Sequence, residues 1–156
     1  MKQENVICRR AGEGPQHHIL GMINEYKLLA SESGQFLSYI AHVPVGCGAP
    51  MHHHDRDSES FYILEGEITM IAPNGTKTVA GPGDYVWYGA GHEHAFVNEG
   101  EVTARAVVTQ SPGLEAELFF AEIDRRGRAE DFEPVRDVTE IGSRNGVRFA
   151  SELEPA

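Results

Sequence analysis

Short runs in which apolar and polar residues alternate fill the first two thirds of the chain. This period of two is typical of β-strands that bury one face. The run 36–45 shows it most clearly, because one face collects Leu37, Tyr39, Ala41 and Val43. Turn-forming pairs such as Asn-Gly and Pro-Gly separate the runs. The pattern therefore predicts an all-β domain built from many short strands.

The same alternation assigns faces to the other strands. After Glu59 it sets Phe61 and Ile63 on the face of the carboxylate, and Tyr62 and Leu64 on the opposite face. In the last strand the residues expected to face inward are Val102, Ala104, Ala106 and Val108. Besides 36–45, strands are expected at residues 6–10, 19–30, 67–71, 76–80, 85–88 and 102–109.

The periodicity changes after the Ser-Pro-Gly sequence at residues 111–113. Ser111 is expected to cap a helix and Pro112 to occupy its first position. A second helix is expected between Pro134 and Arg144. We expect both helices to pack on the outside of the β-domain or to complete a dimer surface, without a chemical role. Helical spacing in the first is shown by Leu114, Leu118, Phe119 and Ile123.

Histidine and glutamate residues cluster in the segment 46–66. If this segment starts as a strand, His52 and His54 project from the same face, and Glu59 follows across a turn. His94 lies downstream and joins them only if the fold brings it near. Three histidines and one carboxylate suit a divalent cation. With room left for water or substrate, this set fits an open catalytic metal site better than a closed structural one.

The spacing within 46–66 also matches a known family. Gly46, His52, His54, Glu59 and Gly66 stand at the positions of the first cupin motif, and residues 83–98 resemble the second motif, which contains His94. Gly89 stands where the family usually has proline. Over residues 20–125 the chain thus resembles a single-domain cupin of the quercetin 2,3-dioxygenase-like type. The resemblance implies a double-stranded β-helix, or jelly-roll barrel, with short C-terminal helices.

The resemblance also implies a function. It points to a metal-dependent dioxygenase acting on an enol or phenol (flavonol-like), in which Glu59 is both ligand and base and the three histidines are neutral donors. One divalent transition metal is expected per chain: Fe, Mn, Ni, Co, Cu or Zn. The alternatives are a metal-dependent isomerase, lyase or decarboxylase, and a binding protein without catalysis. First candidates for the substrate pocket are Phe61, Ile63, His92 and Phe96.

Composition adds limits to this hypothesis. The 156 residues suffice for one domain. Thirteen basic and 24 acidic residues give a net charge of −11, which argues against nucleic acid or an anionic membrane as partner. Two cysteines and no apolar leader lead us to expect a cytoplasmic protein, and we expect a homodimer with a small-molecule substrate. The expected division is an N-terminal arm at 1–19, the barrel at 20–110, helices at 111–150 and a tail at 151–156.

Four residues near the metal motif are expected to have no metal-binding role, and a fifth, His92, is left open. Cys47 is interpreted as an inert small side chain, and His53 as exposed. Asp55 and Asp57 are interpreted as part of a solvated loop. His92, two residues before His94, could share its face as a neighbour or fifth ligand.

Overall fold

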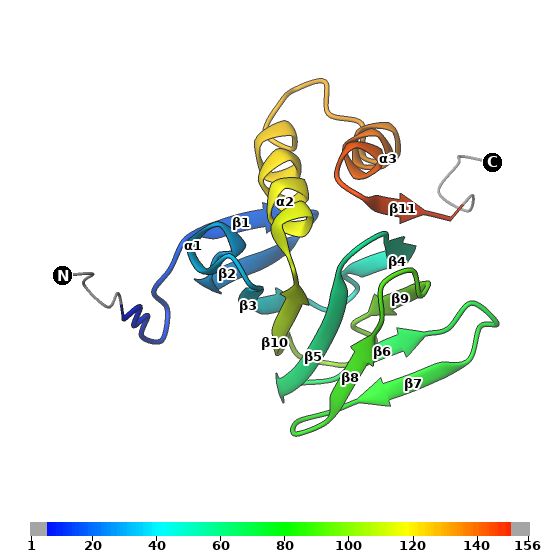
Figure 1. Ribbon diagram of the computed structural model, residues 1–156. Helices are drawn as coiled ribbons and strands as arrows, with labels where there is room; N and C mark the ends of the chain where they lie inside the picture. Colours follow the sequence, from blue (N-terminus) through cyan, green and yellow to red (C-terminus); the bar gives the residue numbers. More distant parts are fainter. Residues whose placement is uncertain (1–5, 151–156) are drawn as a thin grey trace.

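Two antiparallel β-sheets face each other, and two helices lie at one end of them (Figure 1). The computed structural model describes residues 6–150, so the predicted tail at 151–156 and the first five residues of the predicted arm lie outside the described residues. The elements are β1 (Gln16–Ile19), β2 (Met22–Leu28), α1 (Ala30–Ser33), β3 (Leu37–Val43), β4 (Gly48–His54), β5 (Ser58–Glu65), β6 (Ile68–Ile71), β7 (Lys77–Ala80), β8 (Tyr85–Tyr88), β9 (His94–Val97), β10 (Ala104–Ser111), α2 (Leu114–Arg126), α3 (Pro134–Arg144) and β11 (Val147–Phe149).

The strands form a jelly roll, as the sequence predicts. One sheet has the order β1-β2-β3-β10-β5-β8 and the other the order β11-β4-β9-β6-β7. Consecutive strands repeatedly change sheets, which is the topology of a double-stranded β-helix. Between the sheets lies one apolar core whose members include Leu37, Val43, Phe61, Ile63, Ile68, Met70 and Val108.

Alternation predicts most buried faces correctly. In β3 all four residues expected on one face are buried, and the residues between them are partly exposed. The expectation fails at the start of the last strand, where Val102 is 58% exposed. The strand begins only at Ala104, because Val102 belongs to a turn held by the side chain of Asn98, whose Nδ2 donates to the Val102 carbonyl at 2.8 Å.

The segment 6–10 does not form the expected edge strand. β1 already occupies the edge of its sheet, and residues 6–10 pair with no strand of the described chain. Side-chain contacts hold the segment instead: Arg9 Nη1 donates to the carbonyl of Lys27 at 2.8 Å, and the Arg9 guanidinium pairs with Glu32. The segment is therefore anchored through polar side chains and not through a β-ladder.

Helix α2, the first of the two helices predicted from the sequence, starts later than expected. Gly113, not Ser111, is its N-cap residue, with φ of 83°, and a Cβ there would lie 2.5 Å from the carbonyl oxygen of Gln110. Only glycine fits this turn. Helix α2 begins at Leu114. Phe119 and Ile123 of the predicted stripe are buried together with Ala116, whereas Leu114 and Leu118 are about half exposed.

Helix α3, the second of the two predicted helices, has the limits that the sequence predicts. Pro134 occupies its first turn, and the Glu133 carboxylate accepts from the amide of Arg136 at 2.7 Å, which caps the helix. α2 contacts β1 and β3, and α3 contacts β11 and α2. In Figure 1 both helices lie beyond one end of the two sheets. No helix within residues 6–150 combines the length and the apolar run needed to cross a membrane.

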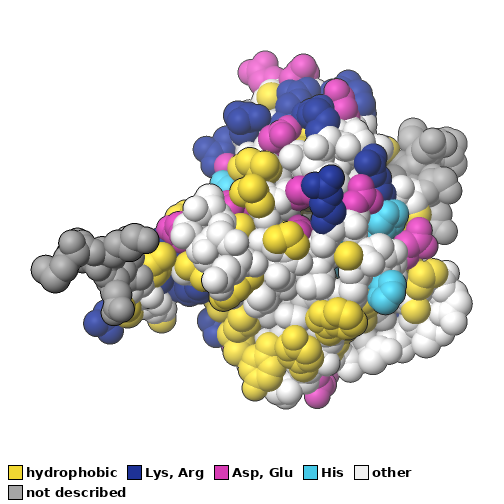
Figure 2. Space-filling view, viewed as in Figure 1, with side chains coloured by type: hydrophobic (Ala, Val, Ile, Leu, Met, Phe, Trp, Pro, Cys, Tyr) yellow, Lys and Arg dark blue, Asp and Glu magenta, His cyan; other side chains and the backbone are white. Residues whose placement is uncertain are grey.

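The outer face of one sheet edge is apolar. Figure 2 shows hydrophobic side chains gathered over the region of β5 and β8. The exposed large residues of these two strands are Tyr62, Leu64, Tyr85 and Trp87. Exposed apolar patches often mark contact surfaces. The homodimer expected from the sequence stays a prediction.

Asn98 ties three segments of the barrel together, and we predict that its loss is costly. Its Nδ2 donates to the carbonyls of Val43 and Val102, both at 2.8 Å, and its Oδ1 accepts from the amide of Gly100 at 2.9 Å. Asn98→Ala leaves these groups without partners, so the free energy of unfolding should fall by about 2 to 4 kcal/mol. Chemical denaturation measures this.

The control is Asn74→Ala. Asn74 is exposed and makes a single hydrogen bond, to the amide of Thr76. Its loss should cost less than about 1 kcal/mol. Equal losses in the two variants would contradict the structural role assigned to Asn98.

Candidate metal centre

Two neighbouring strands of one sheet bring the three motif histidines together. His52 and His54 point to the same face of β4, since they are two residues apart, and both are buried. His94, the first residue of β9, pairs directly with His52 in the ladder. The ring centroids of His52 and His94 are 4.4 Å apart. His53 projects from the opposite face of β4 and lies 3.2 Å from Asp55.

The opposite sheet contributes the carboxylate. Glu59, the second residue of β5, is 4% exposed, and its Oε2 lies 2.9 Å from Nε2 of His54 and 3.3 Å from Nε2 of His94. Glu59 and the three histidines each offer one potential ligand atom, and these four atoms all lie within 4.8 Å of one another. The structure thus brings together the four residues expected to bind metal, from strands of both sheets.

Backbone carbonyls orient two of the imidazoles. Nδ1 of His52 lies 2.7 Å from the carbonyl oxygen of Pro50, and Nδ1 of His94 lies 3.0 Å from that of His92. A carbonyl only accepts, so each Nδ1 carries the proton and each Nε2 keeps its lone pair. Fixing a ligand's tautomer through its other ring nitrogen is typical of metal-binding histidines.

The donor atoms converge without satisfying one another. Within residues 6–150, Glu59 Oε2 and His94 Nε2 are buried and have no hydrogen-bond partner, although they approach each other closely. Buried polar atoms normally have partners, so such orphaned atoms call for an explanation. A cation between them would satisfy both, and three imidazoles with one carboxylate suit a divalent transition metal. The residues therefore fit the metal implied by the sequence.

Burial and mutual charge set the protonation of the cluster. Burial, with the nearby His94 and His54, lowers the pKa of His52 to about 3, so this ring is neutral. Burial also lowers the pKa of His54, but the Glu59 carboxylate outweighs it and holds the pKa above its ordinary value. For Glu59 burial raises the pKa, and the imidazoles of His54 and His94 bring it below the usual range. Glu59 is therefore ionised.

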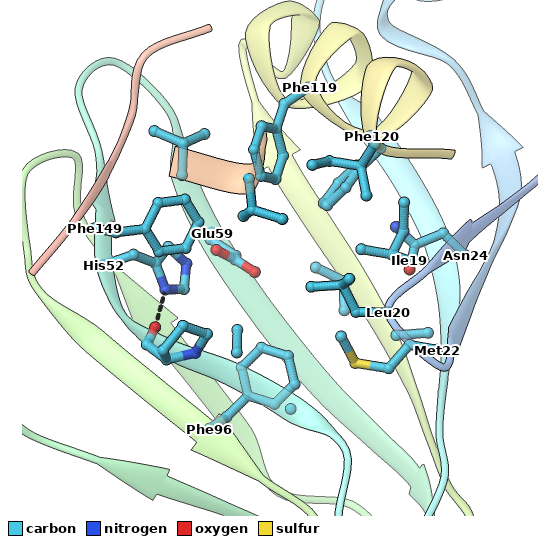
Figure 3. Close-up of a pocket in the computed structure, with 18 of the residues that line it drawn as sticks. Ile19, Leu20, Met22, Asn24, His52, Glu59, Phe96, Phe119, Phe120 and Phe149 are labelled. Atoms are coloured by element: carbon cyan, nitrogen blue, oxygen red, sulfur yellow. Dashed lines mark hydrogen bonds between the residues drawn. The ribbon is translucent and has the colours of Figure 1, made fainter. Parts of the chain in front are cut away.

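Three of the four candidate metal ligands lie in the wall of a cavity of about 160 Å³. His52, His54 and Glu59 line it, and its other walls are mainly aromatic and aliphatic. Figure 3 shows His52 and Glu59 toward one end and Asn24 toward the other, with Phe96 and Phe119 on opposite sides. Residues lining it that sequence reasoning did not single out include Ile19, Met22, Asn24, Tyr39, Phe120, Val138 and Phe149.

Elements outside the two motifs build much of this cavity. α2 and α3, expected to have no chemical role, contribute Phe119, Phe120 and Val138 to its wall, and the three-residue strand β11 contributes Phe149. The Phe149 ring lies 5.7 Å from that of His52. In the sequence, the helix residues that line the cavity are marked only by the apolar stripe of the helix. Such a stripe does not predict which part of the protein the helix packs against.

The expected pocket residues separate into two groups. Phe61 and Phe96 line the cavity. Ile63 is fully buried in the core but is not among the lining residues. His92 is exposed on the turn before β9, and only its carbonyl contacts His94. The expectation that Asp57 lies in a solvated loop is wrong. Its side chain is 3% exposed and accepts a hydrogen bond from the amide of Gly113 at 2.9 Å.

A match to a protein family coincides with this site. Residues 39–110, which include all four metal-binding candidates, match the family model described as the cupin domain, Cupin_2. The chain contains a cupin domain. The cavity wall formed by β1, β2, α2, α3 and β11 lies outside the matched residues.

Two proteins of known activity are similar to parts of this cupin. Over 72 residues it is 35% identical to the dimethylsulfoniopropionate lyase DddQ of Ruegeria pomeroyi, covering 43% of this chain and 35% of the lyase. Over 87 residues it is 33% identical to the quercetin 2,3-dioxygenase of Bacillus subtilis, covering 56% of this chain and 25% of the dioxygenase. The chain thus matches only about a third and a quarter of the lengths of these relatives.

Solved structures agree on the fold. An RmlC-like cupin from Shewanella frigidimarina superposes with a TM-score of 0.60 at 19% identity, covering 75% of this chain and 99% of that one. A predicted oxalate decarboxylase from Thermotoga maritima gives 0.58 at 21% identity, covering 68% and 98%. These likenesses show the fold alone, a jelly-roll barrel.

We predict that His54→Ala greatly reduces metal binding and leaves the barrel folded, since the apolar core between the sheets does not depend on the site. Protein loaded with metal, dialysed and analysed by inductively coupled plasma mass spectrometry should hold a small fraction of the wild-type metal. His53→Ala is the matched control, because His53 is the adjacent imidazole on the opposite face. Metal near one per chain in His54→Ala would show that the ligand set is wrong.

Metal and pH should act together on stability. Without metal, His54 with its raised pKa stabilises the fold below about pH 6.5, and this contribution is lost as the pH rises through the raised value. Metal binding needs the unprotonated ring, so it strengthens over the same range. Melting curves with metal and with chelator should therefore coincide near pH 5 and separate by pH 8. At a free metal concentration about a hundred times Kd, the metal should raise the free energy of unfolding at pH 8 by about 2.7 kcal/mol. Identical melting curves at pH 8 would contradict a bound metal.

Proposed function

We propose that this cupin is a metal-dependent enzyme acting on a small, largely apolar enol or phenol, with a flavonol-like dioxygenase reaction as the first candidate. One observation carries the proposal: Glu59 belongs to the cluster of potential ligands and also lines the cavity. A structural metal would need no such opening toward an apolar chamber. The 33% identity to a quercetin 2,3-dioxygenase over 87 residues supports the dioxygenase class.

The roles of the residues follow from their positions. A divalent metal held by His52, His54, Glu59 and His94 would favour the ionised form of an enol or phenol oxygen. Glu59 Oε2 faces the same space, so this carboxylate can take the proton that the substrate loses. Phe61 and Phe96 come from opposite sheets and pack edge to face, with ring centroids 5.4 Å apart, so together they would form one apolar wall against a planar substrate and exclude water.

A lyase is the second candidate, because the matched segment is 35% identical to the lyase DddQ. The same Glu59 could take a proton from carbon in an elimination, which consumes no oxygen. Oxygen uptake separates the two classes. The metal-loaded protein should consume oxygen with an enol such as quercetin; conversion that proceeds equally well without oxygen would establish the non-oxidative class instead.

Glu59→Gln separates metal binding from proton transfer. The amide oxygen can still approach a metal but cannot accept a proton, so we predict partial metal retention and turnover per bound metal reduced by at least about a hundredfold. Rates are measured on the most active substrate and divided by metal content.

Glu65→Gln is the control, as Glu65 lies on the same strand but is exposed and pairs with Arg105 at 3.0 Å. Its turnover should equal that of the wild type. Normal turnover per bound metal in Glu59→Gln would mean that Glu59 acts only as a metal ligand and not as the base. His92 could not replace it as the base, because its side chain lies outside the cavity.

A further inference from the structure

The cavity contains a second polar feature that the metal centre does not use. Tyr39, on β3, lines the cavity and is 4% exposed. Its hydroxyl oxygen accepts a hydrogen bond from Nε2 of Gln110 on β10, at 3.0 Å. Gln110 is fully buried, and its Oε1 has no partner among the described residues. Such a buried polar pair within an apolar core needs a reason, since burying it costs free energy.

The hydroxyl proton of Tyr39 remains available. The bond from Gln110 occupies a lone pair of the oxygen, and no residue of the described chain accepts from the O–H. The phenol is held edge-on between two rings, Tyr26 and Phe120, each 5.6 Å away between centroids. The ring that carries this donor is therefore held in place by packing, and Tyr39 is one of the residues that line the cavity.

Strand register places this donor beside the candidate base. Gln110 on β10 pairs directly with Glu59 on β5, and directly opposed residues project from the same face. The Tyr39 hydroxyl, 3.0 Å from the Gln110 amide, thus lies on the Glu59 side of the cavity. A substrate bound beside the carboxylate would therefore lie on the same side of the cavity as the Tyr39 hydroxyl.

The charge of the cavity limits what can enter. Of its lining residues, none is Lys or Arg, and Glu59 is the one carboxylate. Beyond the metal-binding residues, its polar side chains are those of Asn24 and Tyr39. A sugar would leave most of its hydroxyls unpaired, and a second anionic group would find no cation. The walls therefore favour a compact molecule with an uncharged, apolar body.

We propose that Tyr39 is a substrate-binding residue that donates a hydrogen bond to a second oxygen of a small uncharged enol or phenol, next to the oxygen held at the Glu59 end. Gln110 is a positioning residue that holds the hydroxyl. This inference rests on the proposed function, and it narrows the substrate class to compounds with two neighbouring oxygens, such as an enol beside a ketone or a catechol.

The test uses maltol, a small uncharged enol with an adjacent ketone oxygen, and the metal-loaded full chain. Binding is measured by titration calorimetry after the metal content of each variant has been matched. Tyr39→Phe keeps the ring and removes the donor, so maltol should bind about tenfold more weakly. Gln110→Met, which frees the hydroxyl to rotate, should give a smaller loss with unchanged metal content.

Tyr26→Phe is the matched control. Tyr26 is a buried neighbouring phenol, but its hydroxyl lies 2.9 Å from Nδ1 of His17 and its ring is not among the cavity residues. Its affinity for maltol should equal that of the wild type. Melting temperatures of both variants show whether either change disturbs folding.

The outcomes separate this inference from the proposed function. Equal affinity in wild type and Tyr39→Phe would overturn the role of Tyr39, whatever the enzyme does. The proposed substrate class would be overturned if the wild-type protein does not bind maltol, or if it binds oxalate or galacturonate as tightly as maltol. A tenfold loss confined to Tyr39→Phe would support the inference even if no enol is turned over, a result that would count against the enzyme and not against the binding site.

Discussion

An ionised carboxylate buried among three imidazoles is the constraint on which the rest of this structure depends. Removing Glu59 from water costs several kcal/mol unless opposite charge surrounds it. The barrel meets this demand by bringing β4 and β9 of one sheet against β5 of the other, so that His54 Nε2 lies 2.9 Å from the carboxylate. Because Glu59 Oε2 and His94 Nε2 have no hydrogen-bond partner within residues 6–150, a cation between them would complete the arrangement.

The cavity beside this cluster is built from two sources. The matched cupin strands supply the candidate ligands together with Tyr39, Phe61 and Phe96, and the elements outside the matched residues supply much of the remaining wall. A common barrel can thus keep one site while its surroundings define the substrate. Phe149 shows this division well, since it comes from the short β11 and yet packs against the ring of His52.

The sequence predicts what depends on local spacing. Period-two alternation identifies the buried face of β3, and motif spacing identifies the four clustered residues, since His52 and His54 share a face in any extended strand. Contacts between distant segments are not encoded locally. Neither the use of α2 to wall the cavity nor the burial of Asp57 against Gly113 can be derived from spacing, because each depends on tertiary packing.

X-ray absorption spectroscopy of the protein's bound metal tests the central claim most directly. The account predicts a shell of nitrogen and oxygen atoms at about 2.0–2.2 Å, with the multiple scattering of about three imidazoles. A sulfur shell near about 2.3 Å, which would implicate Cys8 or Cys47, would contradict it. A shell of oxygen atoms without imidazole scattering would contradict it equally.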